Sequence, residues 1–142
     1  MKSVSTIGVT RRFGSFTAVD GVDFHIQPGE VVGLVGANGA GNTTLIRMIL
    51  GLLEPTAGQI RLFGEVPTRQ QRRRIGYVPP NLGLSRDLTA AENLEFRAET
   101  FGAEPAQIDV GFDGLVEDMS LGAQRRAAFA AASQHDPELL VL

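Results

Sequence analysis

Nine residues, 36–44, carry the clearest chemistry of the sequence, because their types and spacing suit the binding of phosphate groups. The segment reads Gly36-Ala37-Asn38-Gly39-Ala40-Gly41-Asn42-Thr43-Thr44. Its glycines let the backbone bend with several N–H groups pointing inward, and a helix that starts here adds the positive end of its dipole. Thr43 supplies a hydroxyl oxygen, a suitable ligand for Mg²⁺. The segment, hereafter the phosphate loop, matches the template G-x-x-x-x-G-K-[ST] at all but one position.

The exception is Asn42, which stands where the template has lysine. Lysine brings a full positive charge to the β- and γ-phosphates, whereas asparagine is shorter and neutral. Losing one hydrogen bond to a charged group costs about 1.5–3 kcal/mol, roughly one to two orders of magnitude in affinity. We therefore expect weakened nucleotide binding by the backbone alone. An ordinary glycine-rich turn stays open as an alternative, although the spacing does not suit the G-x-G-x-x-G turn of dinucleotide-binding proteins.

The elements that would position the phosphate loop indicate an α/β domain. Val4–Val9 and Ala18–Ile26 alternate apolar and polar residues and predict half-buried strands. Glu30–Val35 is β-branched and apolar, which predicts a strand buried on both faces of a parallel sheet. Thr43–Leu53 is apolar around most of a helical circumference and predicts a helix sandwiched between other layers.

The rest of the chain continues the alternation of strands and helices. Thr89 and Glu92 have the spacing of a capping box, which predicts that a helix starts there and runs to about Phe101. We expect strands at 59–63, 75–78 and 138–142, a short polar helix or loop at 68–74, and a helix at 121–133. This order predicts a mainly parallel central sheet.

Composition limits the classes of protein that fit. A chain of 142 residues with 43% hydrophobic and 20% charged residues is typical of one globular domain. The net charge of −3 gives no reason to expect nucleic-acid binding. The absence of cysteine excludes disulfides and thiolate metal sites. The N-terminus lacks the apolar stretch of a secretory signal, and the most apolar run is interrupted by Arg47, so we expect a cytoplasmic protein.

Several segments, in order, resemble the ATP-binding domain of ATP-binding cassette (ABC) transporters. Phe13 to Thr44 resembles the family's opening, in which an aromatic residue and a pair of strand segments precede the phosphate loop. The resemblance continues through GLLEPTAGQIRLFG, IGYVPPNLGLSRDLTAAENLEF, MSLGAQRR and HDPELLVL. It covers essentially the whole chain. It implies a P-loop NTPase fold of the ABC type, with a mainly parallel central sheet, an antiparallel β part and a shortened helical subdomain.

The resemblance also implies roles for single residues, with ATP and Mg²⁺ as cofactors. Phe13 falls where the family stacks an aromatic ring on adenine, and Thr43 falls at the metal ligand. Phosphate binding is implied for Gly36, Asn38, Gly39, Ala40, Gly41, Asn42, Thr43 and Thr44. Ser120 and Gly122 match the family's signature motif, in a form that resembles the motif of drug exporters. In the family this motif binds the γ-phosphate of the ATP that a partner subunit holds. A core position for Phe13 and an ordinary helix cap for Ser120 stay open as alternatives.

By this resemblance the whole chain is the N-terminal portion of one ATP-binding domain. Residues 1–79 form the core with the phosphate loop, about 80–122 the shortened helical subdomain, and 123–142 the signature helix and the start of the Walker B strand. Pro80 stands where the family has a glutamine that contacts the metal site. We expect the chain to be a fragment that stops before the aspartate and glutamate used in hydrolysis. ATP hydrolysis by it should be undetectable or nearly so.

Three functional hypotheses remain from the sequence. The first is an ATP-binding subunit that couples ATP to transport, working with a membrane-spanning permease and a second ATP-binding subunit at the inner face of the cell membrane. The second is a non-catalytic nucleotide-binding or dimerisation module that pairs with an intact ATPase subunit. The third, an ABC protein acting on ribosomes or DNA, is disfavoured by the net charge and the absence of basic tracts.

Overall fold

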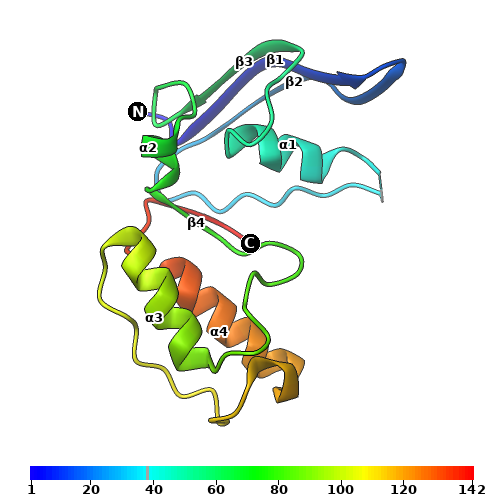
Figure 1. Ribbon diagram of the computed structural model, residues 1–142. Coiled ribbons are helices and arrows are strands. Elements are labelled where there is room, and N and C mark those ends of the chain that lie inside the picture. The colour runs from blue at the N-terminus through cyan, green and yellow to red at the C-terminus, as the bar shows by residue number, and fades with distance from the viewer. Residues whose placement is uncertain (38) are drawn as a thin grey trace. The chain divides into compact units, whose positions relative to one another are not determined.

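A computed structural model describes residues 1–37 and 39–142 and divides the chain into two compact units, Met1–Arg72 and Arg73–Leu142 (Figure 1). Asn38, one of the predicted phosphate-binding residues, lies outside the described residues. Each unit is described by itself below. None of the described helices has both the length and the apolar character that crossing a bilayer requires.

The first unit is built on a three-stranded antiparallel sheet with the order β2-β1-β3. Strand β1 (Val4–Phe13) forms a hairpin with β2 (Phe16–Ile26) and pairs on its other side with β3 (Ala57–Leu62). The three strands predicted near these positions are therefore confirmed. Val4 and Val9 of β1 are completely buried, whereas Ile7 is 61% exposed, because a register shift between Thr6 and Val9 interrupts the alternation of faces.

Helix α1 (Asn42–Ile49) packs on β2 and β3 with one face. Leu45, Met48 and Ile49 are buried, while Arg47 is exposed. The helix is shorter than predicted. Of its eight residues only Thr43 and Arg47 are exposed, while Asn42, Thr44 and Ile46 are half-buried, so a helix sandwiched between other layers stays a prediction.

The strand predicted at Glu30–Val35 is absent: these residues have no regular secondary structure. The side chains of Val31 and Val35 are 101% and 96% exposed. An apolar, β-branched sequence indicates a preference for burial, but a strand also needs a hydrogen-bonded neighbour. Within the described chain no strand pairs with this segment, so the prediction fails for lack of a partner rather than for its composition.

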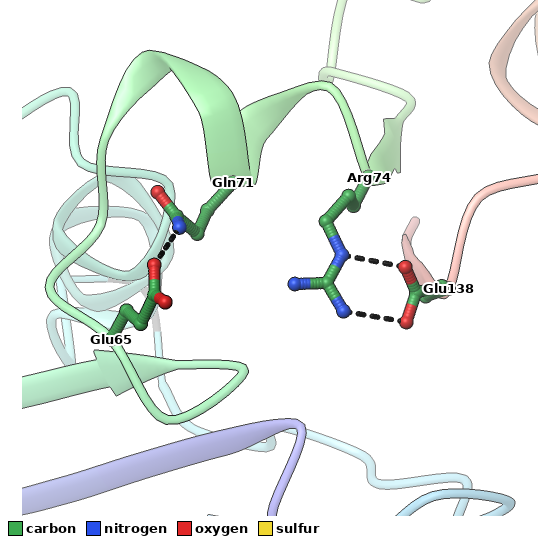
Figure 2. Close-up of polar contacts among 4 residues, drawn as sticks. All are labelled: Glu65, Gln71, Arg74 and Glu138. Carbon is green, nitrogen blue, oxygen red and sulfur yellow. Dashed lines mark hydrogen bonds and ion pairs between the residues drawn. The ribbon is translucent and has the colours of Figure 1, made fainter.

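Helix α2 (Arg69–Arg72) is a single turn held by a buried amide. The side chain of Gln71 donates from Nε2 to the carboxylate of Glu65 (Figure 2). Its amide oxygen accepts a hydrogen bond from the hydroxyl of Thr68. Gln71 is only 4% exposed, so these contacts satisfy a polar group that would otherwise be costly to bury. The predicted short polar helix is confirmed.

The second unit contains the parallel strand pair β4 (Ile75–Tyr77) and β5 (Leu139–Val141). Just before these strands, Arg74 donates from Nε and Nη2 to the two carboxylate oxygens of Glu138, at 2.5 and 2.7 Å (Figure 2). This hydrogen-bonded ion pair lowers the pKa of Glu138. Two parallel hydrogen bonds fix both the distance between the guanidinium and the carboxylate and their relative orientation. The contact therefore supports the strand register in which Ile75 pairs with Leu139.

Two helices pack against each other in the second unit, α3 (Ala90–Phe101) and α4 (Leu121–Ser133), with the 3₁₀ turn η1 (Val116–Asp118) before α4. The predicted capping box is present in full: Thr89 accepts from the Glu92 N–H, and Glu92 accepts from the Thr89 N–H. The buried face of α4 is mostly alanine, including Ala123, Ala127 and Ala131. Such small side chains permit close approach of a neighbouring helix.

His135 follows α4 and stacks on the ring of Phe101, with 3.9 Å between the ring centroids. Its Nε2 lies 3.1 Å from the carbonyl oxygen of Ile75, which identifies Nε2 as the protonated nitrogen of the neutral ring. The other nitrogen, Nδ1, is buried and has no hydrogen-bond partner among the residues that the structure describes. Protonating Nδ1 would bury an unpaired N–H, and burial indeed lowers the pKa of His135 below its ordinary value of 6.5. The positive charge of Arg97 lowers this pKa further.

The lowered pKa of His135 predicts that the protein loses stability in mild acid. As the pH falls, His135 of the unfolded chain binds a proton before His135 of the folded chain does. The stability that the neutral ring contributes to the fold is therefore fully present above about pH 6.5 and declines as the pH falls toward the lowered pKa. Urea unfolding measured between about pH 7.5 and 5.5 should show this decline, and His135→Phe should flatten it. His25→Gln, at an exposed position of β2, is the control and should leave the decline in place. An equal slope in His135→Phe would assign the pH dependence to other groups.

Candidate functional site

Gly41 fixes where the phosphate loop ends and α1 begins. It is the N-cap residue, with φ 90° and ψ 6°, a left-handed conformation that suits glycine. A Cβ added to Gly41 would lie 2.1 Å from the carbonyl oxygen of Ala18 in β2. The backbone of the loop therefore passes directly against the backbone of β2, and only a residue without a side chain fits there.

No side chain of the described residues caps the backbone N–H groups at the start of α1. Gly41 has no side chain to accept from them, and the part of the chain that the structure describes forms no side-chain cap bond there. The first hydrogen bond of the helix runs from the Leu45 N–H to the Gly41 carbonyl, at 2.8 Å. The N–H groups of Asn42, Thr43 and Thr44 consequently have no partner within the helix. Uncapped amides at the positive end of a helix dipole form a site for an anion.

A tight turn precedes this helix start. The N–H of Ala40 donates to the carbonyl of Ala37 at 2.9 Å. A Cβ added to Gly36 would lie 2.7 Å from the Cβ of Ala40, so the described parts of the loop close on one another. The bent, glycine-dependent backbone predicted from the sequence is present at the described positions.

Asn42 occupies the first position of α1, where the phosphate-binding template has lysine. Its side-chain amide donates to the carbonyl oxygen of Leu34 at 3.4 Å, near the upper limit for a hydrogen bond. The side chain is thus folded back onto the chain that enters the loop. This neutral side chain adds no positive charge to the start of α1.

Thr43 and Thr44 follow on the first turn of α1, Thr43 exposed and Thr44 half-buried. The hydroxyl oxygen of Thr43 is a hard ligand of the kind Mg²⁺ accepts. Among the described residues, no group of three His, Cys, Asp or Glu side chains could hold a metal ion. One neutral hydroxyl suits a metal that arrives with phosphate oxygens and water, rather than a metal that the protein holds alone.

Phe13 is the last residue of β1 and lies at the hairpin turn, 46% exposed. The alternative that Phe13 is a core residue is disfavoured by this exposure. The guanidinium of Arg11 lies over its ring, with 4.6 Å between Cζ and the ring centroid. Phe13 and the phosphate loop belong to the same unit, where β1 positions the first and α1 the second.

Ser120 and Gly122 lie at the start of α4 in the second unit, and both are exposed. Ser120 is the N-cap, and its hydroxyl accepts a hydrogen bond from the Ala123 N–H at 3.2 Å. Ser120 therefore caps the helix, as the alternative interpretation of this residue predicted. It is compatible with ligand binding, because a hydroxyl that accepts one hydrogen bond retains its own proton to donate.

Two residues that support these sites are not evident from sequence motifs. Gln124 donates from its side chain to the carbonyls of Val116 and Met119, at 3.1 and 3.0 Å, and so ties η1 to the first turn of α4. Arg11 holds Phe13 as described above. A lone amide in the first turn of an alanine-rich helix is a usable signal for Gln124, whereas Arg11 in an arginine-rich chain offers none.

Pro80, at the position where a glutamine was expected from the resemblance, lies exposed in the turn after β4. The Leu82 N–H donates to the Pro79 carbonyl across this turn, at 2.8 Å. Proline contributes neither a side-chain amide nor an N–H, so this position offers only a carbonyl oxygen to a ligand.

Comparison with known proteins gives a consistent assignment. The ABC transporter family matches residues 19–142. The Nod factor export ATP-binding protein I of Paraburkholderia xenovorans (strain LB400) is 40% identical over 150 residues, which cover 94% of this chain and 49% of the relative. The bacitracin transport ATP-binding protein BcrA of Bacillus licheniformis is 40% identical over 152 residues, covering 98% of this chain and 50% of the relative. This chain thus spans about half the length of these relatives.

Solved structures agree on the fold. An ATP binding subunit of an ABC transporter superposes with a TM-score of 0.81 at 24% identity, over 97% of this chain and 65% of that one. The ATP-binding cassette MJ0796, in a dimeric post-hydrolysis state bound to ADP and Pi, gives a TM-score of 0.79 at 25% identity, over 97% and 72% of the two chains. The predicted P-loop fold of the ABC type is confirmed by these likenesses.

Proposed function

Because this chain belongs to the ABC transporter family, we propose that it binds ATP as the front part of the ATP-binding subunit of an exporter. The observation that carries the proposal is the uncapped start of α1 behind the tight, glycine-dependent phosphate loop. A relative named for Nod factor export supports a role in export, and a relative named for bacitracin transport supports a role in transport. The division of the predicted domain into core, helical subdomain and signature helix remains part of this proposal.

In the proposed complex, the polyphosphate of ATP accepts hydrogen bonds from the backbone N–H groups at the start of α1. The Thr43 hydroxyl would be one ligand of a Mg²⁺ ion bound together with the nucleotide, and that ion would supply neutralisation of the phosphate charge. Phe13 stacks on the adenine ring, since its ring is exposed at the end of the β1–β2 hairpin.

Ser120 and Gly122 serve a second nucleotide in this proposal. Both are exposed at the start of α4, and the helix dipole favours an anion there. They would bind the γ-phosphate of ATP held by a second ATP-binding subunit. A membrane-spanning permease would be the other partner, and it would hold the subunit at the inner face of the cell membrane.

A second candidate function is nucleotide binding without hydrolysis, in a pair with an intact ATPase subunit. Asn42 favours it, because the side chain is neutral and folds back toward the Leu34 carbonyl. Pro80 favours it as well, since it offers no amide where the family has a glutamine. Both replacements lower the stabilisation available to a transferring phosphoryl group more than they affect the backbone amides.

A series of adenine nucleotides tests the proposed function. If backbone amides grip the phosphates, affinity should fall from ATP to ADP to AMP, by about tenfold or more over the whole series. Isothermal titration calorimetry of the full chain with Mg²⁺ measures this directly. Equal affinities for ATP and AMP would show that the phosphate loop does not bind phosphate, and the proposal would then be abandoned.

A further inference from the structure

We propose that Arg11 is a positioning residue for the nucleobase, because it holds the ring of Phe13 with one face covered and the other left for stacking. The inference rests on the proposed function, in which Phe13 stacks on adenine. It adds a residue that the phosphate loop and the signature motif do not include.

Arg11 is well placed for this role because it is itself fixed. Its Nη1 donates to the carbonyl oxygen of Glu54 at 2.8 Å, in the segment between α1 and β3. Its Nε is buried, so the guanidinium is partly enclosed rather than free in solvent. A guanidinium held at one end by a backbone carbonyl loses little further entropy when a ring packs on it.

The contact between Arg11 and Phe13 follows from the strand that carries them. The two residues are separated by one position on β1, so both side chains lie on the same face. The guanidinium carbon lies 4.6 Å from the ring centroid, within the range of a cation–π contact. One face of the ring is thus occupied by a cation, and a purine can approach the opposite face.

Phe16 is the natural comparison for Phe13. It pairs with Phe13 across the two-residue turn of the hairpin and is 60% exposed, so exposure alone would make it a stacking candidate as well. The structure shows an arginine over the ring of Phe13 and no such contact for Phe16 among the described residues. Because Arg11 contacts Phe13, we expect Phe13 rather than Phe16 to be the ring on which the base stacks.

The test separates the nucleoside from the phosphates. The probes are ATP and inorganic tripolyphosphate, both titrated with Mg²⁺ into the full chain by calorimetry. The ratio of the tripolyphosphate Kd to the ATP Kd, the nucleoside factor, reports stacking and cancels changes in the phosphate loop. Arg11→Met keeps an unbranched apolar stem without the cation, and it should lower the nucleoside factor about two- to fivefold. Arg11→Lys keeps the cation and should retain most of the factor.

Controls lie in the same hairpin. Phe13→Leu should lower the nucleoside factor at least as much as Arg11→Met, and Phe16→Leu should leave it unchanged. Each variant is first checked by circular dichroism. If Arg11→Met does not fold, Arg11→Gln, which keeps an N–H donor for the Glu54 carbonyl, replaces it.

Several results would overturn the role of Arg11 while leaving nucleotide binding intact. An unchanged nucleoside factor in Arg11→Met, with a lowered factor in Phe13→Leu, would remove Arg11 from the site. Equal weakening of ATP and tripolyphosphate would make Arg11 a general structural residue. A lowered factor in Phe16→Leu would show that Arg11 does not select the stacking ring. If Phe13→Leu itself has no effect, the adenine contact is wrong, and the phosphate series decides the proposed function separately.

Discussion

An Asn42→Lys variant should bind ATP about ten- to a hundredfold more tightly than the natural chain. Position 42 begins α1, and its neutral side chain now donates to the Leu34 carbonyl at 3.4 Å, a marginal contact that is cheaply given up. A lysine there carries a full charge on a longer stem and can reach the β- and γ-phosphates. Calorimetric titration of both proteins with ATP and Mg²⁺ measures the difference.

The gain in Asn42→Lys should belong to the phosphates rather than to the protein as a whole. Affinity for tripolyphosphate should rise with that for ATP, while affinity for AMP should change little. Asn42→Gln is the matched control, since it lengthens the side chain without adding charge, and it should give no comparable gain. A lysine variant that binds ATP no better than the natural chain would show that position 42 does not face the phosphates.

Local patterns predicted the local structure of this chain well. The strands predicted at Val4–Val9 and Ala18–Ile26 are present as β1 and β2, and Thr89 with Glu92 forms the expected capping box at the start of α3. These predictions depend on residues close in sequence, whose side-chain directions follow from the backbone period. Gly39 and Gly41 of the phosphate loop belong to the same class, because their left-handed backbone is a local requirement.

Predictions that depend on distant partners did less well. Glu30–Val35 has a strand sequence but no strand neighbour in the described chain. The contact of Arg11 with the Glu54 carbonyl joins β1 to a segment more than forty positions later, and no spacing rule predicts it. Such features depend on contacts between residues that are distant in sequence, and no short stretch of sequence predicts those contacts.

Gly41→Ala should be the most destabilising single substitution in the phosphate loop, lowering the free energy of unfolding by about 2–5 kcal/mol. Two costs add. The φ of 90° strains any residue with a Cβ, and that Cβ would meet the Ala18 carbonyl oxygen at 2.1 Å and Val19 Cγ2 at 3.1 Å. Relief requires α1 and β2 to move apart, which also displaces the N–H groups that we propose bind phosphate.

Gly39→Ala separates the two costs of Gly41→Ala. Gly39 has nearly the same φ, 84°, but apart from its chain neighbours no described residue has an atom within 4 Å of an added Cβ. Gly39→Ala should lower the free energy of unfolding by only about 1–2 kcal/mol, which is the cost of the left-handed backbone alone. Urea unfolding at equilibrium measures both variants, with an unchanged slope confirming that stability alone has shifted. Equal losses at positions 39 and 41 would mean that the close approach to Ala18 does not constrain the protein. A larger loss at 41, together with weakened ATP binding, would show that packing against β2 holds the phosphate loop in its binding shape.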